Sequence, residues 1–147
     1  MVYEMTPWQD RFNEPTPKAL RQGLPAPLMK VFDQARAKIL KLDGITESMQ
    51  WYGDCYRWSL EYRLDRNSSD PLAVLVPAPF DLQLAVPIEE GFLASLPSRG
   101  LKRAVRDGLD LAQEAFDTNW AIWSLTPDGI LGDVLRIVER KLKHVAV

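Results

Sequence analysis

The sequence predicts an α+β fold in which an antiparallel sheet of three to five strands is covered by about three helices. Apolar residues recur every three or four positions near the start and again towards the end of the chain, as in amphipathic helices. The middle third instead alternates apolar and polar residues, as in strands that follow one another through short turns. This order favours helices packed on one face of the sheet.

Prolines gather at the N-terminus, where five of the eleven lie within the first 27 residues. Because proline lacks the amide donor and fixes φ, this segment can hold neither a long helix nor a central strand. We expect residues 1–26 to form a Pro-rich arm with one helical turn near residues 18–22, followed by a single α+β domain over residues 27–147. Trp8 and Phe12 indicate that the arm lies over the domain, since free tails rarely carry two large aromatic side chains.

Helical patterns are bounded by recognisable start and stop signals. The first begins after Pro27, ends at Asp43–Gly44 and has a basic last turn, which suits the negative end of the helix dipole. The second has a possible break at Gly108. The third starts at Thr126–Asp128, where a capping hydroxyl precedes proline and an acid, and Glu89–Glu90 favours the positive end of a short helix. The three main helices are expected near residues 28–42, 99–116 and 127–143.

Strict alternation identifies the central strand at residues 56–64. Apolar side chains occupy the even positions and polar side chains the odd ones, which predicts one buried and one polar face. We therefore expect Tyr56, Trp58 and Tyr62 in the core. The other strands are expected at residues 49–52, 72–76, 81–86 and 119–125.

Composition excludes several classes of site. The 147 residues include one cysteine and one histidine, too few for an intrachain disulfide, a thiolate zinc cluster or a multi-histidine metal site. The eight glycines are dispersed, so no phosphate-binding loop or dinucleotide fingerprint can form. With 18 basic and 20 acidic residues, the chain has no overall positive charge to attract a phosphate backbone. We expect no cofactor, no metal and no nucleic acid.

Targeting signals are also lacking in the sequence. No apolar stretch approaches the roughly 18 residues of a membrane span, and the first residues lack the positive flank and apolar run of a secretory signal. We therefore expect a cytoplasmic protein with no membrane contact. Its partner is expected to be a small molecule or another protein, and the sequence leaves the oligomeric state open.

Catalytic arrangements receive little support from the sequence. Cys55 and His144 would have to meet as nucleophile and base, and we expect Cys55 to be a small packing residue instead. Paired carboxylates can act as acid and base without histidine. Glu61, however, is expected to form an ion pair with Arg57 or Arg63. We predict no catalytic residues and keep a small carboxylate-based enzyme as an alternative. The other candidate carboxylates are Glu47, Asp54, Glu89 and Glu90.

Aromatic residues concentrate around the central strand. Most are expected in the core, but those at the strand entrance can line the rim of a cleft together with Trp120 or Trp123. A neighbouring arginine would add charge for a small anionic or planar ligand. The sequence therefore predicts non-catalytic binding of a small ligand or protein partner. The predicted ligand-binding residues are Trp51, Tyr52, Asp54, Arg57 and Glu61.

A basic segment follows at residues 99–106. Its four cations fall opposite Leu101 and Val105 on a helix, so we interpret them as a solvated helix face. A contact surface for an acidic partner is the alternative interpretation, and Lys102 and Arg103 would be its central residues.

Some of these residues carry a resemblance to known families. Trp51–Gly53, Tyr56–Arg63, the strand at 72–76 and the closing pattern at 130–141 resemble an uncharacterised bacterial domain-of-unknown-function family (family 3788). The layout is also similar to YdhG-like α+β domains, through Asp43–Glu47 followed by Trp51–Gly53. The resemblance spans roughly residues 27 to 143 and implies chiefly architecture.

The YdhG-like resemblance also implies a second alternative function. Some YdhG-like proteins are described as frataxin-like iron chaperones that hold iron through acidic surface residues. In this sequence the acids are scattered and the first helix is basic, where an acidic ridge would be needed. An iron-binding chaperone therefore stays an alternative to the binding domain.

Overall fold

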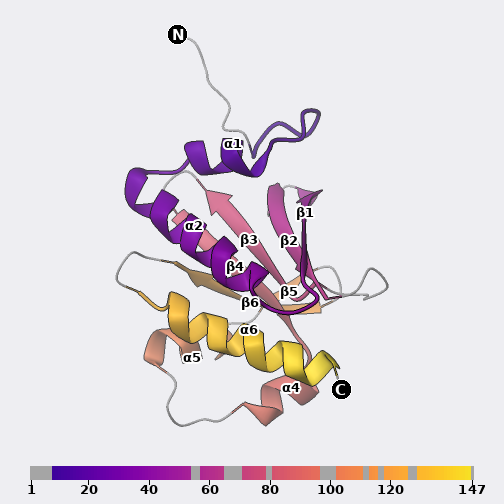
Figure 1. Cartoon of the computed structure of the whole chain (residues 1–147). Helices are drawn as coiled ribbons and strands as arrows, with labels where there is room; N and C mark the ends of the chain where they lie inside the picture. Colours follow the sequence, from indigo (N-terminus) through magenta and orange to yellow (C-terminus); the bar gives the residue numbers. More distant parts are fainter. Residues whose placement is uncertain are drawn as a thin grey trace.

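The structure is a computed structural model that describes residues 8–53, 57–64, 71–78, 81–96, 102–110, 113–115, 118–125 and 129–146. It contains an antiparallel sheet with strand order β1-β2-β3-β4-β6-β5 (Figure 1). The α+β class is confirmed: five strands have six to eight residues, and β5 adds three residues at one edge. The strands are β1 (Thr46–Trp51), β2 (Trp58–Arg63), β3 (Ala73–Ala78), β4 (Asp81–Ile88), β5 (Gln113–Ala115) and β6 (Thr118–Ser124).

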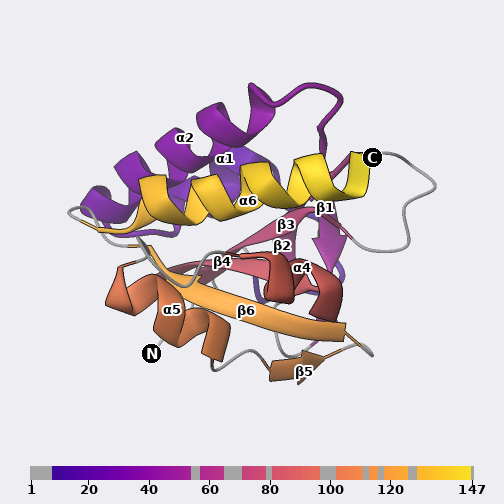
Figure 2. The same cartoon turned by 90° about the horizontal axis from the view of Figure 1, so that it is seen from below.

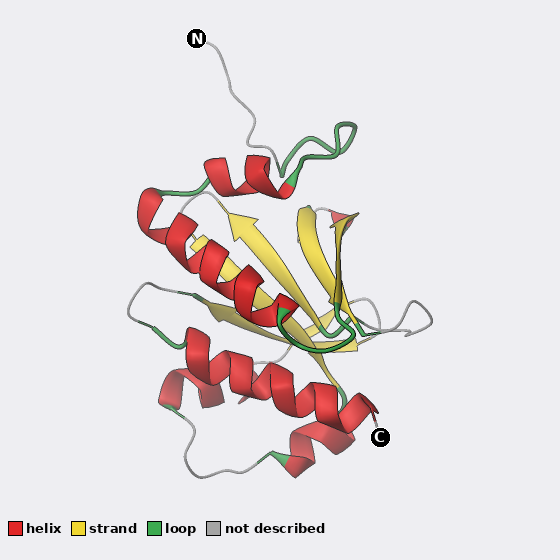
Figure 3. Cartoon of the chain, in the orientation of Figure 1, coloured by secondary structure: helices red, strands yellow, loops and turns green. Residues whose placement is uncertain are grey.

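Helices α2 and α6 lie side by side across one face of the sheet (Figures 2 and 3). Their buried side chains and those of α1 and α5 join the same face of the strands in a single hydrophobic core. Within the described part of the chain, no helix has the length and apolar character needed to cross a membrane. The helices are α1 (Pro17–Gln22), α2 (Ala26–Leu40), α4 (Glu90–Ser95), α5 (Arg103–Asp110) and α6 (Leu131–Ala146).

The N-terminal arm is tied to β2 by two hydrogen bonds. The amide of Trp58 donates to the carbonyl of Trp8 at 3.1 Å, and the indole Nε1 of Trp58 donates to the carbonyl of Asp10 at 2.5 Å. Trp8 is buried, as expected for an arm that lies over the domain. Phe12 was expected beside it but is 89% exposed, because it sits in a turn whose amide is held by the Asp10 carboxylate. The expected helical turn is present as α1, capped by Thr16.

The helix expected over residues 99–116 is shorter than predicted. It ends at Asp110, and residues 113–115 form β5, which pairs antiparallel with β6. Edge pairing with β6 has here outweighed the helical spacing of the apolar residues. Gly108 does not break α5: it leaves room for the indole of Trp123, whose Nε1 donates to the carbonyl of Val105 at 3.0 Å. A side chain at position 108 would overlap that ring.

The last helix begins at Leu131 rather than at Pro127, since Gly129 and Ile130 form a bend. The capping signal at residues 126–128 lies outside the described residues. Near the other end of α6, Lys141 is buried and its Nζ donates to the carbonyls of Pro71 and Leu72 at 2.9 and 3.0 Å. This contact joins the end of α6 to the segment that leads into β3.

The face of the sheet opposite the helices holds a second apolar cluster. Its members come from β3, β4 and β6, and the Tyr52 side chain packs against it. Strand β2 is buried on this face too, although its alternation predicts one polar face: Ser59 and Glu61 are buried along with Leu60 and Tyr62. The buried members of the second cluster are Val74, Val76, Ala85 and Trp120.

Candidate functional site

The predicted ligand-binding residues lie around the hairpin that joins β1 to β2. The amide of Tyr52 donates to the carbonyl of Arg57 at 2.8 Å, and the amide of Arg57 donates to the carbonyl of Gly53 at 2.9 Å. Gly53 has a φ of 69° and Arg57 a φ of 53°, so both adopt the left-handed conformation that this tight connection needs. Asp54 lies outside the described residues, as do Cys55 and Tyr56.

The pleat of β1 separates the two aromatic residues of this site. Trp51 faces the helices and packs edge-on against Trp58, with ring centroids 5.5 Å apart. Tyr52 packs on the opposite face of the sheet against Trp120, with ring centroids 6.3 Å apart. Consecutive residues of an extended chain point to opposite faces, so Trp51 and Tyr52 cannot line one cleft.

Glu61 is the buried carboxylate of this region. It is 5% exposed, and its two oxygens accept hydrogen bonds from the Tyr52 hydroxyl and the Arg63 guanidinium. The expected ion pair is therefore confirmed with Arg63. Both oxygens of Glu61 have partners, as buried charges require. The structure thus brings Tyr52 and Glu61 together and places Trp51 on the other face of the sheet, while Arg57 meets Tyr52 through its backbone.

A second polar group, formed around Glu47, links the sheet to α2. Arg36 binds the Glu47 carboxylate with two hydrogen bonds of 3.0 and 2.7 Å, and the Tyr62 hydroxyl donates to Glu47 Oε2 at 2.8 Å. Burial, and then the nearby Glu47 carboxylate, raise the pKa of Tyr62 well above its ordinary value. The bond to Glu47 also raises the pKa of Arg36. Because both oxygens of the Glu47 carboxylate accept hydrogen bonds, Glu47 and Arg36 have the features of a structural ion pair.

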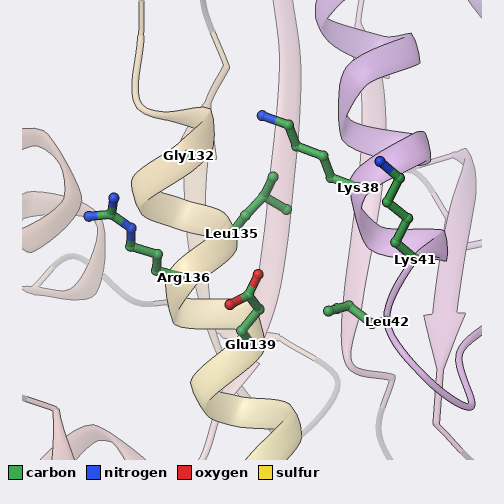
Figure 4. A pocket seen from close by; sticks show the side chains of 7 residues that line it. All are labelled: Lys38, Lys41, Leu42, Gly132, Leu135, Arg136 and Glu139. Carbon is green, nitrogen blue, oxygen red and sulfur yellow. The ribbon is translucent and has the colours of Figure 1, made fainter.

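A groove of about 410 Å³ lies between α2 and α6 (Figure 4). Leu42 and Leu135 form its apolar part, and Glu139 points from α6 towards α2. Lys38 lies in the last turn of α2 and Lys41 is the C-cap residue of this helix; neither makes an ion pair with any described residue. We call this the α2–α6 groove; it is lined by Lys38, Lys41, Leu42, Gly132, Leu135, Arg136 and Glu139.

The α2–α6 groove was not anticipated from the sequence. From the sequence, the basic last turn of α2 indicates only a match to the helix dipole. The groove needs the end of α2 to meet the first half of α6, two segments about a hundred residues apart, and only the tertiary packing places them together. The feature of the sequence that points to the groove is the repeat of charged residues on the exposed side of both helices.

The remaining charged groups are dispersed over the surface. Lys102 pairs with Asp133 at 3.1 Å and Arg103 with Asp107 at 3.9 Å, consistent with a solvated helix face. His144 is half-exposed, and its Nε2 lies 4.0 Å from Glu89. Among the residues that the structure describes, no three His, Cys, Asp or Glu side chains come together as ligands for a metal ion.

Comparison with protein-family models, with curated proteins and with solved structures finds no significant match to this chain. The resemblance to family 3788 and to the YdhG-like domains therefore stays a prediction.

Proposed function

We propose that this chain is a non-catalytic binding domain for a small anionic ligand, and that the ligand occupies the α2–α6 groove. The observation that carries the proposal is the pair of lysines, Lys38 and Lys41, beside an open groove of about 410 Å³. That volume falls within the range of small-molecule sites. Neither lysine has an acidic partner among the described residues, so an anion in the groove would supply one.

The residues that line the groove also indicate which kind of ligand it would bind. Leu42 and Leu135 offer apolar contact beside the lysines, while Glu139 places one negative charge among them and Arg136 is turned to the far side of α6 (Figure 4). This combination suits a molecule with an acidic group on an apolar body. Because the charged side chains are exposed, each ion pair contributes only about 0.2–1 kcal/mol, and we expect weak binding that falls with salt.

The hairpin residues support a ligand site less well. The Tyr52 hydroxyl and the Glu61 carboxylate already bind each other, and Trp51 lies on the other face of the sheet. A ligand there would have to displace a buried ion pair, which costs several kcal/mol. The iron chaperone and the carboxylate enzyme stay alternatives without a supporting cluster in the described part of the chain.

Titration calorimetry with octanoate and with the neutral analogue octanol tests the proposal. We expect octanoate to bind, octanol to bind more weakly, and the octanoate affinity to fall as salt is raised. Replacing both lysines (Lys38→Gln with Lys41→Gln) should weaken binding about two- to thirtyfold, because it removes two ion pairs of the strength given above.

Lys30→Gln is the matched control. Lys30 is exposed on the same helix but does not line the groove, and its substitution removes the same kind of charge. It should leave the affinity within about twofold of the unaltered protein, which is the range of ordinary surface changes. Absence of octanoate binding, or equal losses in the control and the double variant, would contradict the proposed function.

A further inference from the structure

Strand β1 is an open edge of the sheet (Figure 1). Directly after β1, the amide of Tyr52 donates to the carbonyl of Arg57. In an antiparallel pair the residues that bond to the partner strand alternate with residues that do not, so from Tyr52 back along β1 every second residue bonds to β2. The amides and carbonyls of Glu47, Met49 and Trp51 therefore point away from β2. Within the residues that the structure describes, none of these three has a backbone hydrogen bond on that side.

This edge carries only one of the devices that usually prevent strand addition, the inward-pointing charge of Glu47. Natural edge strands are shortened, bulged, or carry lysine or proline. Strand β1 has six residues, with neither lysine nor proline among them, and its pairing with β2 is continuous from Thr46 to Trp51. Its one charged side chain, Glu47, is already neutralised by Arg36.

We propose that β1 pairs antiparallel with β1 of a second copy of this chain, about a two-fold axis through Met49. In this register Met49 faces itself, Glu47 faces Trp51, and Ser48 faces Gln50 of the second copy. All three outward pairs then exchange two hydrogen bonds each, so every open donor and acceptor of the edge is used. No like charges face one another, and the edge is therefore complementary to itself.

A second copy of this chain is the partner of β1 because the strand is complementary to another β1 in this register. Met49 is half-buried against the core on the helix side, and the two methionines would meet there. On the other side Ser48 and Gln50 are exposed in the single chain and would become neighbours. One strand pair buries little surface compared with the roughly 1,200 Å² of a stable interface, so we expect a weak, concentration-dependent dimer.

Two charge variants test the register without disturbing the core. Ser48→Lys with Gln50→Lys places like charges opposite each other twice and should weaken dimerisation about three- to tenfold. Ser48→Lys with Gln50→Glu places opposite charges at the same positions and should strengthen it by a similar factor. As a control, Gln22→Lys with Gln34→Lys adds the same charge at exposed sites on α1 and α2.

Sedimentation velocity over a concentration series measures the dimer, and hydrogen exchange of the amides of Glu47, Met49 and Trp51 locates it. We expect these amides to become protected as concentration rises. A chain that stays monomeric with unprotected amides would overturn the proposal. So would equal dimerisation of the two charge variants, or protection of the three amides only when an unrelated extended peptide is added. Octanoate binding in the α2–α6 groove is independent of every one of these outcomes.

Discussion

Gly108→Ala is expected to destabilise the fold, although alanine is the better helix former. Inside a helix the substitution alone gains about 1 kcal/mol. At position 108 the new methyl group would overlap the indole of Trp123, and such overpacking costs about 1–3 kcal/mol. The ring is also held by the bond from its Nε1 to the carbonyl of Val105, and losing that bond costs about 1 kcal/mol or more. We expect the free energy of unfolding to fall by about 1–3 kcal/mol.

Urea unfolding of Gly108→Ala and Gly132→Ala measures this difference. Gly132 lies in the first turn of α6 with nothing near its missing Cβ, so its substitution should be neutral or stabilising by up to about 1 kcal/mol. Repeating Gly108→Ala in a Trp123→Phe background should shrink the loss, because the two residues are in contact. If Gly108→Ala stabilised the protein as much as Gly132→Ala, the reasoning about the Trp123 indole would be refuted.

Two further predictions concern the buried Tyr62 and the half-buried Tyr52. Because burial raises the pKa of Tyr62, the unfolded chain loses this proton first, and the free energy of unfolding should fall by up to about 1.4 kcal/mol per pH unit above about pH 10. Urea unfolding between about pH 9 and 11 should show this slope and Tyr62→Phe should lack it; equal slopes would contradict the assignment. Tyr52→Phe removes the hydroxyl donor to Glu61 and should cost about 1–3 kcal/mol at neutral pH, a loss that an unchanged urea midpoint would disprove.

Periodicity predicted the elements whose side chains face one environment along their whole length. The helix expected at 28–42 is present as α2 with its start moved to Ala26, and the strand expected at 81–86 is β4, two residues longer. The region of β5 was misassigned because its helical spacing of apolar residues competes with pairing to β6, and a non-local partner is not visible in a window of sequence.

In the candidate site, too, contacts within one strand can be predicted from the sequence, whereas contacts between elements far apart in the chain cannot. The ion pair of Glu61 with Arg63 follows from two residues two positions apart on one strand face, and it was predicted correctly. The pairing of Tyr52 with Trp120 depends on the order of the strands, and the α2–α6 groove depends on how two helices cross. Neither relation can be derived from the spacing of residues along the chain.

The burial of Lys141 gives this protein a chemical reporter of its own unfolding. Amine-reactive reagents attack lysines according to their access to solvent, and most lysines of this chain extend freely from the helices. The Lys141 amine is enclosed and bound to two carbonyls, so it should be acylated only when α6 leaves the segment at Pro71 and Leu72. Mass spectrometry of that one peptide would then follow the opening of the core without any added label.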